Sequence, residues 1–305
     1  MAPRSETRQS EVIEQVVALA RTRLGSKAGP AEAFLRLFYA NLAPEDLLAS
    51  TVEDLYGAGI ALWQFGRTRQ PGKAKVRVYT PRLAEHGWNS THSVIEIVND
   101  DMPFLVDSVA AELNRREVGV HLIIHPIVRV VRDAKGTLKE LAAPGADGAI
   151  NESYMHVEID QQVGGEHLAE IELGLSTVLG DVRASVADWR TMLARAKSVI
   201  AELTDQPPPL PEEEVKTARD FLSWMLSDHF TFLGYREYEF VGEGESARAN
   251  VVDGTGLGLC RDEDFVIFEG LRDLATLPPD VRDFVRQKRL LMITKANRRS
   301  TVHRP

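Results

Sequence analysis

The peptide SVIEIVNDDMPFLVDSVAAEL, residues 93–113, changes its hydrophobic period halfway along. Its first part alternates with a period of two, which predicts a strand over residues 92–98. Its second part carries apolar residues four apart, at Leu105, Val109 and Leu113. This spacing predicts a helix, with Asp101 placed to cap it and Pro103 in its first turn. A strand that leads directly into a helix indicates the start of an α+β unit.

Elements on both sides extend this unit. Residues 75–80, 119–132 and 153–160 also alternate as strands, and Pro126 suggests a bulge or an edge position in the second of them. A helix follows and is expected to end near Gly180. The order strand, helix, strand, strand, helix is most of a ferredoxin-like split βαββαβ unit. The expected last strand is missing, and residues 75–80 are a candidate to fill the empty sheet edge.

The flanking segments complete the predicted organisation. Residues 1–70 show helical spacing and form a small helical cap. The central domain is predicted to cover 75–203. Its last part, 181–203, repeats apolar residues at spacings of four and three, which is a heptad seam. The seam could pack within the chain or contact a partner subunit, and the sequence favours neither. Four prolines in 204–214 predict a stiff linker and a domain boundary. The chain stops soon after a predicted strand, so 215–305 is expected to be a truncated α+β domain.

Composition limits the classes of partner. The 305 residues include 36 basic and 45 acidic side chains, and the resulting net charge of −9 argues against nucleic acid. The longest apolar run, 118–131, is interrupted by polar residues and is shorter than the ~20 residues that a bilayer requires. A single cysteine, Cys260, excludes an intrachain disulfide and a Cys-rich zinc site. Because residues 1–8 lead into no signal-peptide core, we expect a cytoplasmic location and no membrane partner.

The common signatures of catalysis and cofactor binding do not occur in the sequence. Gly254, Gly256 and Gly258 form G-x-G-x-G and not the G-x-G-x-x-G of a dinucleotide-binding turn, so a flexible loop is predicted there. No P-loop, G-x-S-x-G or H-E-x-x-H motif is present. We therefore predict no catalytic, cofactor-binding or metal-ligating residue, and an independent enzyme is the least favoured interpretation.

Histidines and glutamates gather on one face of the predicted sheet. His121 and His125 share a strand, but four residues of extended chain separate them by about 13 Å, so this pair alone does not suit one metal ion. The same face is predicted to hold further polar residues: His92, Glu96, His156 and Glu158. A metal or proton-handling site is one interpretation. A half-polar sheet surface that docks against another sheet or subunit is the favoured one.

The turn between the strand and helix of the 93–113 peptide is the best candidate for ligand binding. Free backbone N–H groups and the positive end of the helix dipole would face a ligand carboxylate there, and nearby carboxylates could receive an ammonium group. An α-amino acid carries both charges. The candidate effector-binding residues are Asn99, Asp100, Asp101, Met102, Pro103, Phe104 and Leu105. The alternative is that Asp101 only caps the helix.

Several blocks of the sequence also resemble a known family. Residues 101–109, DMPFLVDSV, resemble the Asp-x-Pro-Gly-Leu-Leu turn of ACT domains, which are small amino-acid-sensing modules. Blocks in the same order along the whole chain are similar to the amino-terminal region of the very large bacterial NAD-specific glutamate dehydrogenases: 93–113, 121–131 (HLIIHPIVRVV), 153–160 (SYMHVEID), 228–239 (DHFTFLGYREYE) and 293–305 (ITKANRRSTVHRP). Phe104 stands where amino-acid-binding ACT domains usually place glycine, and its side chain would crowd a ligand approaching the backbone.

This resemblance implies a noncatalytic regulatory or assembly segment, in which an ACT-type domain supports a dehydrogenase domain that lies downstream. The parent reaction would be oxidative deamination of L-glutamate to 2-oxoglutarate and ammonium, with NAD bound outside this chain. The implied partners are an amino-acid effector, the remainder of the dehydrogenase polypeptide and further copies in a homo-oligomer. Two alternatives remain: a stand-alone amino-acid-binding module, and an oligomerisation domain that acts through the 182–203 seam.

Overall fold

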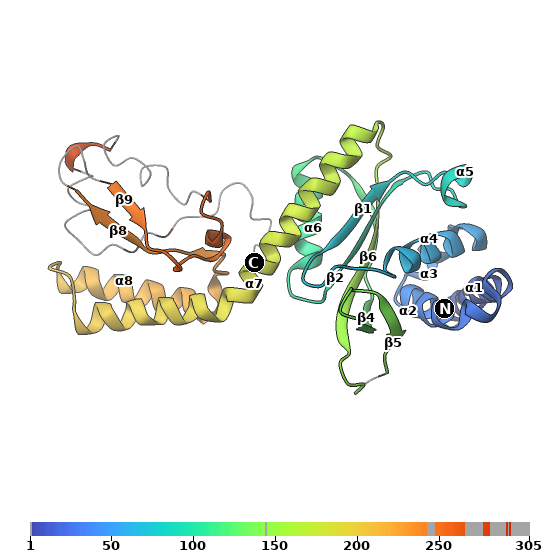
Figure 1. Cartoon of the computed structure of the whole chain (residues 1–305), viewed down its shortest axis with the longest axis horizontal. Coiled ribbons are helices and arrows are strands. Elements are labelled where there is room, and N and C mark those ends of the chain that lie inside the picture. The colour runs from blue at the N-terminus through green and yellow to red at the C-terminus, as the bar shows by residue number, and fades with distance from the viewer. Residues whose placement is uncertain are drawn as a thin grey trace. The chain divides into compact units, whose positions relative to one another are not determined.

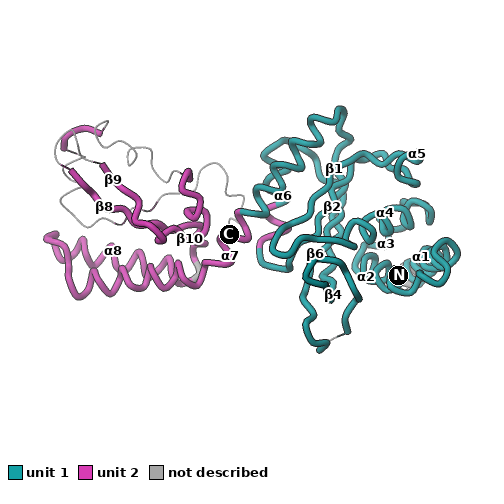
Figure 2. Tube along the Cα trace, in the orientation of Figure 1, with its two compact units in different colours: residues 1–103, 109–180 teal, residues 104–108, 181–305 magenta. Residues whose placement is uncertain are grey.

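The computed structural model describes residues 2–143, 145–242, 248–265, 277–280, 291 and 293, and part of the predicted truncated domain at 215–305 therefore lies outside the described residues (Figure 1). Contacts within the chain divide it into two compact units (Figure 2). Unit 1 comprises Met1–Pro103 and Val109–Gly180, and unit 2 comprises Phe104–Ser108 and Asp181–Pro305. The fold is of the predicted α+β class, with helices packed on an antiparallel sheet in unit 1.

An antiparallel sheet forms the centre of unit 1. Its strands lie in the order β1-β2-β6-β4-β5, and β3 also pairs with β6. The bounds are β1 Lys75–Tyr79, β2 Ser93–Asp100, β3 Val120–Ile124, β4 Ile127–Arg132, β5 Leu138–Leu141 and β6 Ile150–Ile159. β2 and β6 are the most buried strands, because helices cover both faces of the sheet.

The strand that precedes the βαββα unit occupies the edge that its missing last strand would fill. β1 pairs antiparallel with β2, with Val78 opposite Ile95, and β6 pairs with the other side of β2. The prediction for residues 75–80 is therefore confirmed. This edge of the sheet is therefore formed by β1, a strand that precedes the unit in the sequence.

The predicted single strand over 119–132 is two strands in the structure. β3 and β4 both pair with β6, and the chain breaks between them at His125 and Pro126. Proline has no N–H to donate to a ladder, although the Pro126 carbonyl still accepts a hydrogen bond of 3.1 Å from the Tyr154 N–H. The irregularity predicted from Pro126 is thus present, and it divides the strand.

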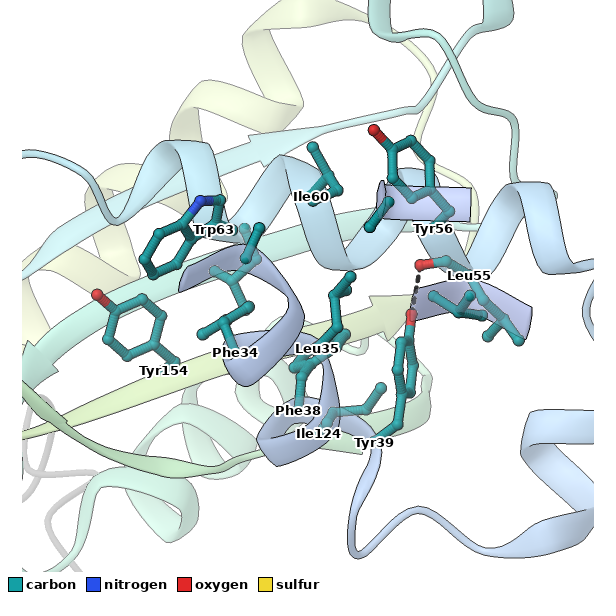
Figure 3. Close-up of a cluster of buried hydrophobic side chains, with 14 of the residues drawn as sticks. Phe34, Leu35, Phe38, Tyr39, Leu55, Tyr56, Ile60, Trp63, Ile124 and Tyr154 are labelled. Carbon is teal, nitrogen blue, oxygen red and sulfur yellow. Dashed lines mark hydrogen bonds between the residues drawn. The ribbon is translucent and has the colours of Figure 1, made fainter. Parts of the chain in front are cut away.

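Four helices cover one face of the sheet: α1 Ala2–Leu24, α2 Ala28–Tyr39, α3 Pro44–Leu48 and α4 Val52–Phe65. Their core meets the sheet through an aromatic cluster (Figure 3). The Phe34 ring centroid lies 5.3 Å from those of both Trp63 and Tyr154, so residues from α2, α4 and β6 join in one core. The Tyr39 hydroxyl donates to the Leu55 carbonyl at 2.6 Å and fixes α2 against α4.

This helical layer lies on the face that the sequence predicts to be an open docking surface. His156 is buried, and its ring centroid is 5.8 Å from that of Phe38 and 6.3 Å from that of Trp88. The prediction that another sheet or subunit covers this face is wrong, because the chain's own helices cover it. Tyr and His rings that look polar in sequence pack here through their carbon atoms.

The opposite face of the sheet packs against α6 from Val109 onward and against the first part of α7, Gly165–Asp205. Buried apolar residues of both helices form this layer: Val109, Leu113, Ile171, Leu175 and Val178. The predicted helix end near Gly180 does not occur, because one helix runs through that residue. A single glycine inside a long helix costs only about 1 kcal/mol.

The division between the units falls at Gly180 and Asp181 inside α7, whereas the sequence places the boundary in 204–214. The proline-rich residues form a short connection from α7 to α8, Glu212–Trp224, within unit 2. The predicted heptad seam on α7 is unevenly packed. Val182 is fully buried, while Trp189 is 47% exposed.

Unit 2 continues from α8 through a π-helical turn, Met225–His229, into short strands. These are β7 Gly234–Tyr235, β8 Tyr238–Val241, β9 Arg248–Val251 and β10 Leu257–Gly258; β7 pairs with β10 and β8 with β9. The predicted flexible loop around Gly254–Gly258 is instead a hydrogen-bonded turn. Gly258 has φ +57°, and a Cβ there would collide with the Leu233 carbonyl oxygen.

Asp188 of α7 anchors this glycine turn. Its carboxylate accepts hydrogen bonds from the Gly258 N–H at 2.8 Å and from Arg261 Nη2 at 2.6 Å. The Arg261 guanidinium, together with the Gly258 N–H, lowers the pKa of the Asp188 carboxyl, although burial opposes this shift. The ionised form of Asp188 therefore stabilises the folded unit.

We expect Asp188→Asn to lower the stability of unit 2 by about 1 kcal/mol at pH 7, a modest effect because Arg261 is more than half exposed. A carboxyl whose pKa is lower in the folded state stabilises above its unfolded pKa and loses that contribution as the pH falls through its folded pKa. The difference between wild type and variant should thus shrink below about pH 4 in urea unfolding followed by tryptophan fluorescence. Asp220→Asn, an exposed change on α8, is the control. A difference independent of pH would contradict this explanation.

Candidate functional site

The predicted effector turn connects the end of β2 to α6, which begins at Leu105. The Asp101 N–H donates to the Asn151 carbonyl at 3.0 Å and extends the pairing with β6 by one residue. The first helical hydrogen bond runs from the Ser108 N–H to the Phe104 carbonyl at 3.0 Å. Phe104 therefore occupies the N-cap position, and the prediction that Asp101 caps the helix is wrong.

The turn residues differ in their exposure. Asn99 and Leu105 are buried, Pro103 is exposed, and four residues are intermediate: Asp100, Asp101, Met102 and Phe104. Phe104 has φ +71°. This left-handed conformation favours glycine, since other side chains clash with the backbone there. The turn thus keeps the backbone conformation of a glycine at the position where ACT domains usually have one.

We expect Phe104→Gly to be more stable than Phe104→Ala by about 1 kcal/mol, because both variants lose the ring but only alanine keeps the penalty of a positive φ. Thermal unfolding of the two variants measures this difference. Met102 lacks a positive φ, so Met102→Gly should be less stable than Met102→Ala. The same order at both positions would contradict a strained backbone at Phe104.

A buried ion-pair network lies beside this turn. Glu152 on β6 is fully buried and accepts hydrogen bonds from Arg69 Nε at 3.0 Å and from Arg132 Nε at 2.6 Å. Arg132 Nη2 also reaches the second Glu152 oxygen at 2.7 Å. Burial opposes the charge of Arg132, but the hydrogen bonds and charge interactions with Glu152 and Tyr154 together outweigh it and raise the pKa of the guanidinium.

The same network connects three parts of unit 1. Arg69, which follows α4, also pairs with Asp100 at the start of the turn. Arg132 donates to the carbonyl of Gly66 at 2.8 Å, at the end of α4. The network therefore ties the helical layer, the sheet and the turn together. Nothing in the sequence pattern indicated it, since Arg69 and Glu152 are separated by 83 positions.

Three histidines of the predicted polar sheet face, His92, His121 and His125, lie in two separate places. His92 Nδ1 lies 3.2 Å from Glu158, His121 Nε2 lies 2.7 Å from Asp160, and the two imidazole centroids are 4.4 Å apart. His125 instead contacts the Ser153 hydroxyl at 2.6 Å. Burial lowers the pKa of His125, with Asp101 opposing the shift. Among the residues that the structure describes, no group of three His, Cys, Asp or Glu side chains is arranged to hold a metal ion.

Two further observations concern candidate sites elsewhere. Cys260 is buried, and burial raises the pKa of its thiol, which does not favour the reactive thiolate form. Within the described part of the chain, no helix is both long and apolar enough to cross a membrane.

Comparison with known proteins agrees with this architecture. The family described as "Glutamate dehydrogenase, ACT1 domain" matches residues 34–175. The match begins at Phe34, the residue whose ring packs on Tyr154, and it covers the second half of α2, α3, α4 and the sheet.

Three similar proteins are all NAD-specific glutamate dehydrogenases. The chain is 36% identical to that of Halomonas elongata over 98% of its length and 36% identical to that of Pseudomonas aeruginosa over 92%. It is 26% identical to that of Mycobacterium tuberculosis over 64%. The chain spans only 19%, 17% and 12% of the lengths of these proteins. It therefore resembles an amino-terminal region of NAD-specific glutamate dehydrogenases, and its residues 34–175 match the ACT1 domain described for glutamate dehydrogenases.

Proposed function

We propose that this chain is a noncatalytic regulatory and assembly segment of an NAD-dependent glutamate dehydrogenase. The observation that carries the proposal is the similarity of nearly the whole chain to about a fifth of each of two such enzymes, together with the ACT1 match. In this proposal, polypeptide outside these 305 residues binds NAD and oxidatively deaminates L-glutamate to 2-oxoglutarate and ammonium.

The arrangement of side chains in unit 1 favours the role of a scaffold. Three of its buried or largely buried charges, Arg69, Arg132 and Glu152, bind one another and backbone carbonyls, so their protons are held and not exchanged with a substrate. Both faces of the sheet are occupied by helices of the same chain. Such an arrangement suits a platform that holds other domains better than it suits an acid–base catalyst.

A chimeric enzyme tests this proposal. The matching segment of the Pseudomonas aeruginosa enzyme is deleted in one variant and replaced by this chain in another. We expect the deletion to lose activity or the native oligomer size, and the chimera to recover it. The assays are glutamate-dependent NAD reduction and sedimentation. NAD reduction by this chain alone, or a deletion variant unchanged in both assays, would overturn the proposal.

We also propose that the segment contributes to a homo-oligomer through the 182–203 seam of α7. The half-exposed Trp189 supports this, because an indole on an otherwise apolar helical seam is a common interface anchor. Trp189→Glu should dissociate the oligomer in sedimentation without changing thermal unfolding, since the ring is not in the core of unit 2. A monomeric wild-type enzyme would end this proposal.

A further inference from the structure

A stack of exposed aromatic rings begins on α8 and continues into the π-helical turn that follows it. The Trp224 ring centroid lies 6.0 Å from that of Phe221 and 4.6 Å from that of His229, and both of these rings are stacked on the indole. The Phe230 ring meets the same indole edge-on at 5.5 Å. Phe221, Trp224 and Phe230 are 47%, 46% and 51% exposed. Single exposed apolar residues are common, whereas a contiguous group of them marks an interaction site.

The rings of α8 do not belong to the core of unit 2. The helix buries Val215 and Leu222, which lie seven residues apart on one side of it. Successive helical residues are about 100° apart, so Phe221 and Trp224 point away from that side. Their exposure therefore follows from the helical period, and the buried core of unit 2 is complete without them.

A hollow with a volume of about 390 Å³ lies beside Phe221 on the exposed side of α8. This volume is in the range of cavities that hold small ligands. Glu213 and Glu214 form part of its wall, and neither carboxylate has an ion-pair partner among the residues that the structure describes. The rings and the lining residues of the hollow together form one surface, the α8 face: Glu213, Glu214, Thr217, Ala218, Phe221 and Trp224.

The chemistry of the α8 face selects a cationic and planar partner. An aromatic ring attracts cations to its face, and the guanidinium group of arginine both stacks on such rings and pairs with carboxylates. The ammonium group of lysine is more strongly hydrated and does not stack. The two glutamates would repel the phosphates of nucleic acids and of anionic lipids. A second copy of this chain would bring the same carboxylates to the contact, and the α8 face contains no lysine or arginine.

We infer that the α8 face binds an arginine-bearing segment of the remaining dehydrogenase polypeptide. Guanidinium groups stack on Phe221 and Trp224 and pair with Glu213 and Glu214 at the hollow. The inference rests on the proposed function and gives the scaffold a defined contact. The chain spans only 19% and 17% of two similar enzymes, so in the proposed enzyme most of the polypeptide is covalently attached to this segment. Attachment raises the effective concentration of the arginines, and a contact that is weak between separate molecules is then occupied.

Calorimetry on the purified 305-residue chain tests the chemistry of the α8 face, with hexa-arginine and hexa-lysine peptides as probes. We expect hexa-arginine to bind about tenfold more tightly, because the two peptides carry the same charge and only guanidinium groups stack on the rings. Trp224→Ser should abolish most of this difference, and Trp224→Phe, which keeps a ring, should retain it. Trp189→Ser makes the same change at a 47% exposed indole on α7 and should leave the difference unchanged. Equal binding of the two peptides, or equal effects of the two serine variants, would overturn the inference.

Charge variants separate the α8 face from the net charge of the chain. Glu213→Gln combined with Glu214→Gln should weaken hexa-arginine by about tenfold and reduce the dependence of its affinity on salt. Glu166→Gln combined with Glu170→Gln is the matched control, since it removes two exposed carboxylates near the start of α7. An equal loss of affinity in both double variants would show that only the net charge attracts the peptide, and the inference would fail.

Photo-crosslinking in the chimeric enzyme identifies the source of the arginines. With Trp224 replaced by p-benzoylphenylalanine, we expect mass spectrometry to find a cross-link to an arginine-containing peptide outside the segment that this chain replaces. A cross-link to the α8 face of a second copy, or none at all in an assembled chimera, would contradict the inference and leave the regulatory and assembly role standing. A chimera that fails to assemble would count against the proposed function, while the peptide titrations would still decide the chemistry of the α8 face.

Discussion

Glu152→Gln is expected to destabilise unit 1 by about 3–5 kcal/mol. The neutral amide would leave the Arg69 and Arg132 guanidinium groups buried with one remaining carboxylate, that of the partly exposed Asp100. Removing one partner of a buried ion pair costs far more than the pair contributes, because the remaining charge stays desolvated.

Urea unfolding at pH 7, followed by circular dichroism, measures this loss, and hydrogen exchange assigns it to the sheet. Glu140→Gln on β5 is the matched control: it makes the same chemical change at an exposed site and should stay within about 0.5 kcal/mol. Replacing all three charges together (Arg69→Met, Glu152→Leu and Arg132→Met) should recover much of the loss. A single-variant effect below 1 kcal/mol would contradict the burial of this network.

Phe34→Ala is expected to cost about 3–5 kcal/mol and to loosen the helical layer from the sheet. Phe34 is fully buried, and its ring centroid lies 5.7 Å from that of Phe38 and 5.3 Å from that of Tyr154 on the sheet (Figure 3). The rings around Phe34 belong to α2, α4 and β6. They therefore cannot close around the cavity that alanine would leave without moving α2.

Limited proteolysis together with urea unfolding tests this prediction, because a loosened layer exposes α1 and α2 to cleavage. Leu37→Ala is the control on the same helix: Leu37 is 45% exposed, so its truncation should cost less than about 1 kcal/mol and leave cleavage unchanged. Equal effects at the two positions would show that Phe34 does not hold the layer on the sheet.

The central part of the fold could be predicted from the sequence because its hydrophobic periods are regular. The change of period in 93–113 locates β2 and α6, and the alternation in 75–80 locates the strand that closes the sheet edge. Local patterns of this kind depend on neighbouring residues and so need no knowledge of distant contacts.

The remaining features depend on residues far apart in the chain. The helical layer covers the face that holds Tyr154 and His156, and the sequence could not show that these rings meet Phe34 and Phe38 more than a hundred residues earlier. For the same reason, the partners of Glu152 were not predicted. The ion-pair network at the candidate turn requires the register of β6, which the sequence does not specify.

Closure of the sheet by β1 has a consequence for biosynthesis. Every strand of the sheet and both of its helical layers are encoded before residue 181, so a nascent chain can finish folding this domain while the ribosome is still translating unit 2. A ferredoxin-like topology with its last strand in the usual place would have to wait for that strand. Here the order of the gene lets a stable domain form early and shields its apolar surfaces during synthesis of unit 2.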